Sequence, residues 1–304
     1  MANRVHYPSL ASFDDVTLVA LCDLVPEKLE RTAAKFGIPK TYTNYREMIE
    51  KEDLDAVYIL MPPHHLFDIT MDCLERGLHV FIEKPPAVTA FQTAALARAA
   101  AKHGCLTATG FNRRFIPVLA AVREQVLAHG PVIQAVSTFY KKGSAVYYRG
   151  AIDAFTCDAI HAVDTLRWMA GGEVTAVASL VSNYGDVVDN SWNALVRFDN
   201  GAAGILLTNW NVGGRVHSFE MHAAGMSAFI DPNYSGFLLR GAEREPLDPA
   251  AFAGTTEEYK FYGFYDQARH FIDCIKEGRQ PQTNFADALK TMELVDRIKA
   301  CAIG

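Results

Sequence analysis

The sequence predicts an α/β protein with two parts: a doubly wound parallel sheet, and after it an α+β domain built on a large, mostly antiparallel sheet. Three observations carry this prediction. Short apolar stretches alternate with helical stretches through the first hundred residues, several strand-like stretches then follow one another, and two helical stretches finish the chain. Strands that alternate with helices are typical of parallel sheets, whereas consecutive hairpins are typical of antiparallel ones.

Four buried strands are expected in the first part. Their residues are β-branched or otherwise apolar with little alternation, as in strands that are covered on both faces. The expected strands are 16–23, 56–62, 79–85 and 105–111, and the expected helices are 26–36, 44–50, 65–77 and 90–104. Gly37, Gly77 and Gly104 supply helix C-terminal signals, and Thr89 can cap the fourth helix. Ligands of such sheets bind outside the carboxyl ends of the strands.

The pattern changes near residue 116. A helix is expected at 118–130, and helices again at 265–278 and 285–304. Between them lie strand-like stretches at 132–140, 175–184, 191–198, 201–210, 218–225 and 227–231. Asp199-Asn200-Gly201 is a hairpin turn signal between two of these strands. We therefore expect two domains, 1–115 and 116–304, with C-terminal helices that can pack back on the first domain.

Composition excludes several classes of protein. The 304 residues carry a net charge of -6, which disfavours nucleic acid and anionic membranes as partners. No apolar run approaches the roughly 18 residues of a membrane span, and no secretory signal is visible. The six cysteines form no C-x-x-C pair, so free thiols in a reducing compartment are expected rather than disulfides or a metal site. The expected location is cytoplasmic.

Two charged residues end expected strands and are candidate site residues. Asp23 follows the first strand, where an acid can accept hydrogen bonds from the adenine ribose of NAD and repel the 2′-phosphate of NADP. An aspartate there is also typical of a helix cap. Lys84 follows the third strand, beside Glu83, and two prolines hold the chain stiffly after it. A lysine so placed can move a proton at a substrate hydroxyl, although a surface lysine is the common alternative.

Several ordered segments resemble the Gfo/Idh/MocA oxidoreductases, the family of glucose-fructose oxidoreductase and myo-inositol dehydrogenase. EKPPAVT, with MPPHHLFDITMDCLERGLHVFI ahead of it, is similar to the EKP signature of that family. VALCDLVPEKLERTAAKFGI, YTNYREMI, GFNRRFIPV, DAIHAVDTLRWMAGG and the C-terminal stretch from FYDQARHF onward resemble further family segments in the same order. The resemblance covers nearly the whole chain and implies a Rossmann-like first domain.

The resemblance implies site roles residue by residue. Lys84 matches the signature lysine beside substrate and nicotinamide, and His161 matches the acid/base histidine. In inositol dehydrogenase-like members an aspartate stands four residues before this histidine, where this chain has Cys157; Asp158 stands three before and is expected to orient His161. Without the family, His161 in an amphipathic helix would more often be structural. Implied cofactor-binding residues are Asp23, Pro62, His64, Glu83, Lys84, Asn112 and Arg113, while Tyr147-Tyr148 and Trp168 are candidates to line a sugar pocket.

The family's G-x-G-x-x-G/A phosphate loop does not occur in this sequence. RVHYPSLASF resembles the family's first helix beyond those glycines. We expect that the first strand and its loop, about a dozen residues by the usual unit, are missing from this chain. Either the native protein is longer or its sheet lacks the central strand; the former is favoured, because the latter would expose strand edges. Cofactor binding by the chain as given is left open.

The leading functional expectation is an NAD(P)-dependent oxidoreductase, with NAD favoured over NADP. It would act on a hydroxyl or keto carbon of a sugar, cyclitol or related polyol. Two alternatives stay open: a non-catalytic ligand-sensing or partner-binding member of the fold, and a redox-neutral enzyme that uses bound NAD. An exposed sheet face in the second domain favours a homodimer or homotetramer.

Overall fold

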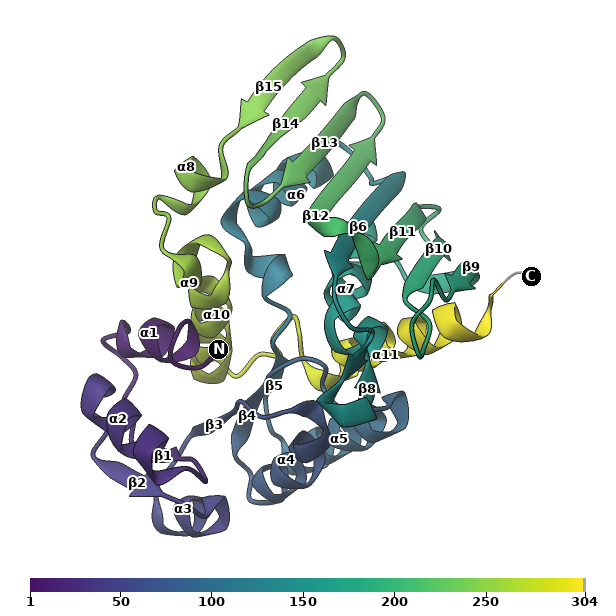
Figure 1. Ribbon diagram of the computed structural model, residues 1–304. Helices are drawn as coiled ribbons and strands as arrows, with labels where there is room; N and C mark the ends of the chain where they lie inside the picture. Colours follow the sequence, from purple (N-terminus) through teal and green to yellow (C-terminus); the bar gives the residue numbers. More distant parts are fainter. Residues whose placement is uncertain (303–304) are drawn as a thin grey trace.

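The computed structural model describes residues 1–302 and confirms the expected fold class (Figure 1). Two small parallel sheets with their helices form one part, and an eight-stranded sheet with helices on one face forms the other. The last two residues of the helical stretch expected at 285–304 lie outside the described residues; within them the final helix, α11, is Phe285–Ala300.

The parallel strands of the first part fall into two sheets. β1 (Ala20–Cys22) pairs with β2 (Lys40–Tyr42), and β3 (Ala56–Ile59), β4 (His79–Ile82) and β5 (Thr107–Thr109) form the second sheet in that order. Among the described residues no ladder joins β1 to β3. β1 is shorter than the expected strand 16–23, because its ladder with β2 extends over only three residue pairs.

The helices between these strands begin and end where the sequence signals them. They are α2 (Pro26–Phe36), α3 (Tyr45–Lys51), α4 (Leu66–Glu75) and α5 (Ala90–His103). Gly37 and Gly104 end α2 and α5 in the left-handed conformation, with φ of 65° and 68°. The Thr89 side chain accepts a hydrogen bond from the Gln92 backbone N–H, as expected of a cap.

The large sheet has the strand order β15-β14-β13-β12-β6-β11-β10-β9. Among the eight described strands of this sheet, β6 with β11 is the one parallel pair, so the expectation of a mostly antiparallel sheet is confirmed. The strands are β6 (Gln134–Lys142), β9 (Val174–Ser182), β10 (Ser191–Phe198), β11 (Ala203–Asn209), β12 (Asn211–Ala223), β13 (Met226–Asp231), β14 (Ser235–Arg240) and β15 (Glu243–Leu247).

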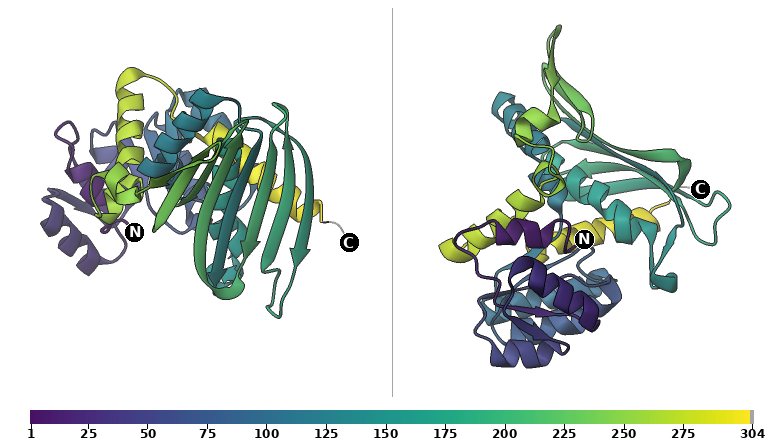
Figure 2. Two further views of the ribbon diagram at one scale, coloured as in Figure 1. Left: turned by 90° about the horizontal axis from the view of Figure 1, so that it is seen from above. Right: turned by 60° about the vertical axis from the view of Figure 1, so that its left-hand side comes forward.

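Helices cover one face of the large sheet (Figure 2). α6 (Pro117–His129) packs on β12 and β13, α7 (Ile160–Ala170) on β6 and β11, and α11 on β9 and β10. The remaining elements of the second part are β7 (Val146–Tyr147), η3 (Tyr148–Gly150), β8 (Ile152–Asp153), η4 (Phe155–Ala159), α8 (Pro249–Ala253), α9 (Glu258–Phe261) and α10 (Phe264–Glu277).

The C-terminal helices return to the first part of the chain. α11 packs along α5, and α10 packs against α1 (His6–Ala11). Phe271 of α10 is fully buried against Phe81 of β4. The two parts therefore share an extended apolar contact.

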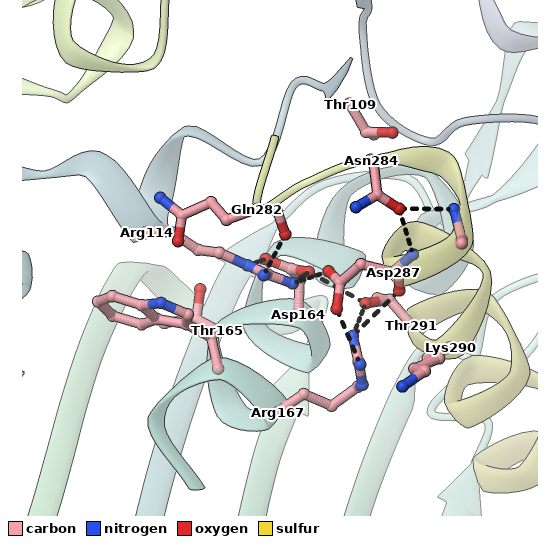
Figure 3. A network of polar contacts seen from close by, with 12 residues as sticks. Thr109, Arg114, Asp164, Thr165, Arg167, Gln282, Asn284, Asp287, Lys290 and Thr291 are labelled. Atoms are coloured by element: carbon pink, nitrogen blue, oxygen red, sulfur yellow. Dashed lines mark hydrogen bonds and ion pairs between the residues drawn. The ribbon is translucent and has the colours of Figure 1, made fainter. Parts of the chain in front are cut away.

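A buried ion network ties three elements together at this junction (Figure 3). Arg114 donates from Nε and Nη2 to the two oxygens of Asp164 on α7, at 2.8 and 2.5 Å. It also contacts Asp287 of α11 at 2.6 Å, and Arg167 of α7 reaches the same aspartate at 3.2 Å. Because α7 also carries His161, the network holds the helix of a candidate site residue.

Two further observations concern the cysteines and membranes. All six cysteines are free thiols in this structure. Within residues 1–302, no helix combines the length and the apolar character that crossing a membrane requires.

Candidate active site

Strand ends and the loops that follow them carry most of the site residues inferred from the sequence. Asp23 follows β1, Pro62 and His64 follow β3, and Lys84 follows β4. Asn112 and Arg113 follow β5, in the short helix η2 (Asn112–Phe115), and His64 lies in η1 (Pro63–His65). Parallel strands of one sheet end at a common edge, which is where the ligands of doubly wound sheets bind.

Lys84 reaches from this edge to the second part of the molecule. Its Nζ donates a hydrogen bond to the Cys157 carbonyl oxygen at 2.9 Å and lies 3.5 Å from the Asp158 carboxylate. Its side chain is 16% exposed, and the Lys84–Pro85 peptide bond is cis. The lysine therefore bridges the two parts and keeps its ammonium within reach of a bound ligand.

Asp158 takes a different role from the expected one. Its carboxylate contacts Lys84, Lys141 and the Tyr147 hydroxyl, and no hydrogen bond joins it to His161 within the described residues. The reason is local: Asp158 lies in the π-helical turn η4, ahead of α7, so its side chain does not line up with His161 as in a regular α-helix. The described residues therefore show no direct hydrogen bond through which Asp158 would orient His161.

Two ammonium groups determine the charge state of Asp158. Burial by itself would raise the pKa of this carboxyl, but Lys84 and Lys141 outweigh it and hold the pKa well below its usual range. Asp158 is therefore ionised at neutral pH. It acts as the common partner that positions both lysines.

His161 is close enough to Lys84 to be affected by the charge of the ammonium group. Burial lowers its pKa well below the usual value, and the charges of Arg113 and Lys84 add to this effect. The ring is 5% exposed, and its Nδ1 is buried without a hydrogen-bond partner in the described structure. At neutral pH His161 is thus an uncharged imidazole that can accept a proton.

The Glu83 carboxylate has two hydrogen-bond donors, and one of them is the Lys84 backbone N–H at 3.2 Å. The other is Nε2 of His6 at 2.7 Å. Burial alone would raise the pKa of Glu83, but His6 and Lys84 lower it below the usual value. A Cβ added at Gly110 would lie 3.0 Å from the same carboxylate, so Gly110 lets β5 approach it. Glu83 therefore stabilises the carboxyl end of β4.

Replacing Gly110 by alanine should disturb the Glu83–His6 pair. The added methyl would crowd the carboxylate at 3.0 Å, and a buried carboxylate has little room to move. We expect a loss of about 1–3 kcal/mol in the free energy of unfolding, typical of overpacking, measured by urea denaturation. Gly143→Ala is a matched control, because nothing lies within 4 Å of a Cβ at that glycine; equal losses in both variants would contradict the proposed crowding.

Asn112 and Arg113 are both buried, and they join the segment before α10. Asn112 donates from Nδ2 to the Tyr262 carbonyl oxygen at 2.8 Å and accepts from Nη1 of Arg113 at 2.7 Å. The Arg113 guanidinium lies over the Tyr262 ring, 4.5 Å from its centre. The Asn112 amide is thus occupied within the protein, and Arg113 lies at the inner wall of the site.

The remaining predicted residues differ in their relation to this cluster. The Asp23 carboxylate accepts a hydrogen bond from the Val25 backbone N–H at 2.9 Å, in the turn before α2. The N-cap residue of α2 is Val25, so Asp23 does not cap this helix. The His64 ring lies 5.5 Å from that of Tyr148, across the junction of the two parts. Trp168 instead stacks with Arg123, 4.6 Å from its guanidinium, and lines a surface hollow of about 600 Å³ with Arg114 and Pro117. Trp168 is therefore not a wall of the Lys84–His161 cluster.

Several residues of the cluster were not predicted from the sequence. Lys141 stands at the end of β6, and Arg215 and His217 stand on β12, whose His217 is the cross-strand partner of Phe139. The His217 ring stacks on Phe139 at 4.2 Å, and burial lowers its pKa well below the usual value. The signal available in the sequence was a histidine at an inward-facing position of an apolar strand, where a polar side chain is uncommon.

A short arm supplies the tyrosines of the cluster. β7, η3 and β8 form it, and Tyr148 and Arg149 have φ of 50° and 58°, which is unfavourable for residues other than glycine. Strained backbone of this kind is found preferentially at functional sites. The arm places Tyr147 against Asp158 and Tyr148 against His64, so it lies over the Lys84–His161 cluster.

The sequence and the fold of this chain are similar to those of known oxidoreductases. A family model described as "Oxidoreductase family, NAD-binding Rossmann fold" matches residues 1–111, and one described as "GFO/IDH/MocA C-terminal domain" matches residues 149–227. The chain is similar to scyllo-inositol 2-dehydrogenase (NAD(+)) of Bacillus subtilis, with 25% identity over 94% of this chain and 86% of that one. It is also similar to 4-carboxy-2-hydroxymuconate-6-semialdehyde dehydrogenase of Sphingobium sp., with 25% identity over 97% and 93%.

Solved structures share the fold. A dehydrogenase from Chromobacterium violaceum superposes with a TM-score of 0.90 at 22% identity, over 99% of this chain and 92% of that chain. The likeness extends over both parts of the molecule.

Proposed function

Because the chain belongs to the Gfo/Idh/MocA family of oxidoreductases, we propose that it transfers a hydride between NAD and a hydroxyl or keto carbon of a sugar, cyclitol or related polyol. The supporting observation is the approach of Lys84, from the first part of the chain, to Asp158 and His161 of the second. A held ammonium beside a neutral imidazole is suited to move a proton at a reacting hydroxyl.

The residues at the strand ends fit parts of the cofactor. Asp23 uses one carboxylate oxygen in the turn before α2 and would offer the other to the adenine ribose. His64 and Lys84 would lie toward the nicotinamide end. Bound NAD⁺ would accept the hydride from the substrate carbon.

Protein side chains would handle the proton. In the oxidation direction, neutral His161 would take the hydroxyl proton as the C–O bond gains double-bond character. Lys84, held by Asp158 and the Cys157 carbonyl, would hydrogen bond to the same oxygen and stabilise charge on it. In the reduction direction the same groups would return the proton. His161, Lys84 and Asp158 are thus proposed as base, polarising group and positioning residue.

A panel of polyols and sugars tests the proposed function. We expect NADH absorbance to rise with at least one CH–OH compound when NAD⁺ and the full chain are present. Binding of panel compounds without any turnover would instead favour the ligand-sensing alternative.

The pH dependence of oxidation should report the lowered pKa of His161. The reaction needs the neutral imidazole, so activity is lost as pH falls through the pKa of that group. A free imidazole is half protonated at about pH 6.5; because burial and nearby cations lower the pKa of His161, kcat should stay level below that pH. His161→Gln should lose most activity, and what remains should no longer decline at low pH. His222→Gln, on the exterior of β12, should keep the native activity and the native pH profile. A half-maximum at or above pH 6.5 would contradict the assignment.

The uncovered face of the large sheet supports a homo-oligomer. Residues directly opposite one another on neighbouring strands point to the same face, and Leu195, Ile205 and Val136 form such a row across β10, β11 and β6. The row continues through Glu220 to Phe229 and Phe237. Leu195 is 61% exposed, although leucine favours burial. We propose that this face is covered by a second copy, in a homodimer or homotetramer.

Light scattering measures this assembly. The native chain should have at least twice the monomer mass, and Leu195→Glu should shift it toward the monomer, because burying an unpaired charge in an apolar interface is costly. Val187→Glu is the control, since Val187 is 83% exposed in the loop before β10. A monomeric native chain would contradict the proposal.

Two further points remain proposals. We infer a domain boundary near residue 115, supported by the matched ranges 1–111 and 149–227. The free cysteines and the net charge of -6 support a cytoplasmic protein without nucleic-acid or membrane partners.

A further inference from the structure

Two neighbouring buried arginines, Arg113 and Arg114, differ in how their charge is balanced. Arg114 is paired with Asp164 and Asp287. Arg113 is only 6% exposed, yet it makes no ion pair with any carboxylate in residues 1–302. Its Nη1 donates to Asn112, the Tyr262 ring lies over its guanidinium, and its Nε has no partner.

Other cations surround Arg113. Arg215 donates to the Tyr262 hydroxyl at 3.1 Å, on the same ring that Arg113 covers, and no carboxylate pairs with it in the described chain. Lys84 and Lys141 share one carboxylate, that of Asp158. With Arg113 included, this region of the described chain thus holds four cationic side chains and, even with Glu83 counted beside Asp158, only two carboxylates. The protein as a whole has a net charge of -6.

Two buried histidines, His217 and His161, lie close to these cations. Both ring nitrogens of His217 lack a partner within the described residues, and so does Nδ1 of His161. His217 is 1% exposed, and Arg113 and Arg215 lie close enough to lower its pKa. Leaving buried donors and a buried guanidinium unpaired is costly unless a ligand pairs with them.

We propose that the substrate carries an oxyanion group, a carboxylate or a phosphate, and that Arg113, Arg215 and His217 bind it. This inference rests on the proposed function, which it narrows from neutral polyols to acidic ones. Guanidinium groups suit oxyanions because they can donate two parallel hydrogen bonds. Arg215 and His217 belong to β12, which pairs with β6, and the His161 helix α7 packs on β6. The group would therefore lie on the substrate side of the reacting hydroxyl.

The phosphates of the cofactor are the other possible source of the anion, so the experiment separates the two. Intrinsic tryptophan fluorescence follows binding without cofactor, because Trp210 lies edge to face on Phe139, the partner of the His217 ring. The probes are D-gluconate, D-glucose 6-phosphate and neutral D-sorbitol. NADH titration and NAD⁺-linked turnover are measured on the same proteins.

We expect at least one anionic probe to bind about ten-fold more tightly than sorbitol, and added salt to reduce the difference. Arg215→Gln should remove most of that preference, while NADH affinity changes less than about two-fold. Arg215 is exposed, so this variant is expected to fold. Arg197→Gln, an exposed arginine on β10 of the same sheet, should behave like the native chain.

The outcomes distinguish this inference from the proposed function. Equal response to anionic and neutral probes, including no response to either, overturns the inference. A loss of NADH affinity in Arg215→Gln as large as the loss for the anionic probes also overturns it, since the cofactor would then be the source. Turnover of neutral polyols without preference for acids would support the proposed function and contradict the anion site. Arg215-dependent binding of the anion without any turnover would support the anion site and contradict the proposed function.

Discussion

Replacing Lys84 by alanine lowers kcat/KM for the oxidised substrate by about 10²–10⁴-fold, the range expected for loss of a group that acts on the transferred proton. NADH binding weakens by less than about ten-fold, because the strand-end residues that would contact the cofactor remain. The effect on kcat should exceed the effect on KM, since an ammonium that stabilises charge developing on the substrate oxygen acts mainly in the transition state.

The fold should tolerate this substitution. Asp158 would keep Lys141 as its partner, so no unpaired buried carboxylate is created. Circular dichroism and the urea midpoint should therefore be close to those of the native chain. Lys102→Ala, at the exposed end of α5, is the control and should leave turnover unchanged. If Lys84→Ala turned over substrate at the native rate, Lys84 would have no part in the mechanism.

Replacing Asp164 by asparagine should have the largest effect on stability. The change leaves Arg114 buried with only Asp287, which is itself partly exposed. Removal of one partner from a buried ion pair typically costs about 3–5 kcal/mol, because the remaining charge is uncompensated. Urea denaturation followed by circular dichroism measures the loss. Turnover should also fall, because α7 carries both Asp164 and His161.

Two further variants make this prediction specific. Glu47→Gln removes a partner from the exposed pair with Lys51 and should leave the urea midpoint unchanged, since solvent screens such pairs. The double variant Arg114→Met with Asp164→Leu removes both charges and should recover much of the lost stability. A single variant as stable as the native chain would show that the network in Figure 3 contributes little.

Local signals in the sequence were enough to identify most elements of the fold. These signals act within a few residues of the chain, so their effect can be predicted without knowledge of the fold. They include the glycines at helix ends, Thr89 before α5 and the turn at Asp199-Asn200-Gly201. Five strands were missed: β2, β14, β15 and the two-residue strands β7 and β8. Their pairing depends on neighbours, and the exposed, charged β15 in particular lacks the alternation that marks a half-buried strand.

Lys84 and His161 were predicted as site residues from the family resemblance, without knowledge of the geometry. The contact partner of Asp158 could not be inferred in the same way. In a regular α-helix the Asp158 side chain would lie about one turn from His161. In the π-helical turn η4 it points toward Lys84 and Lys141 instead. Helix type at a terminus depends on tertiary packing, which sequence spacing does not report.

By itself, then, the sequence determined the order of strands and helices, the family and the lysine at the end of β4, because each depends on residues close together in the chain. Only the tertiary structure decided that Arg113 and Arg215 meet at Tyr262, with His217 close to both arginines. It also decided that Arg113 has no carboxylate partner in the described chain while Arg114 has two. The reason is physical: charge balance inside a protein depends on which distant segments pack together, and burial makes each unpaired group costly.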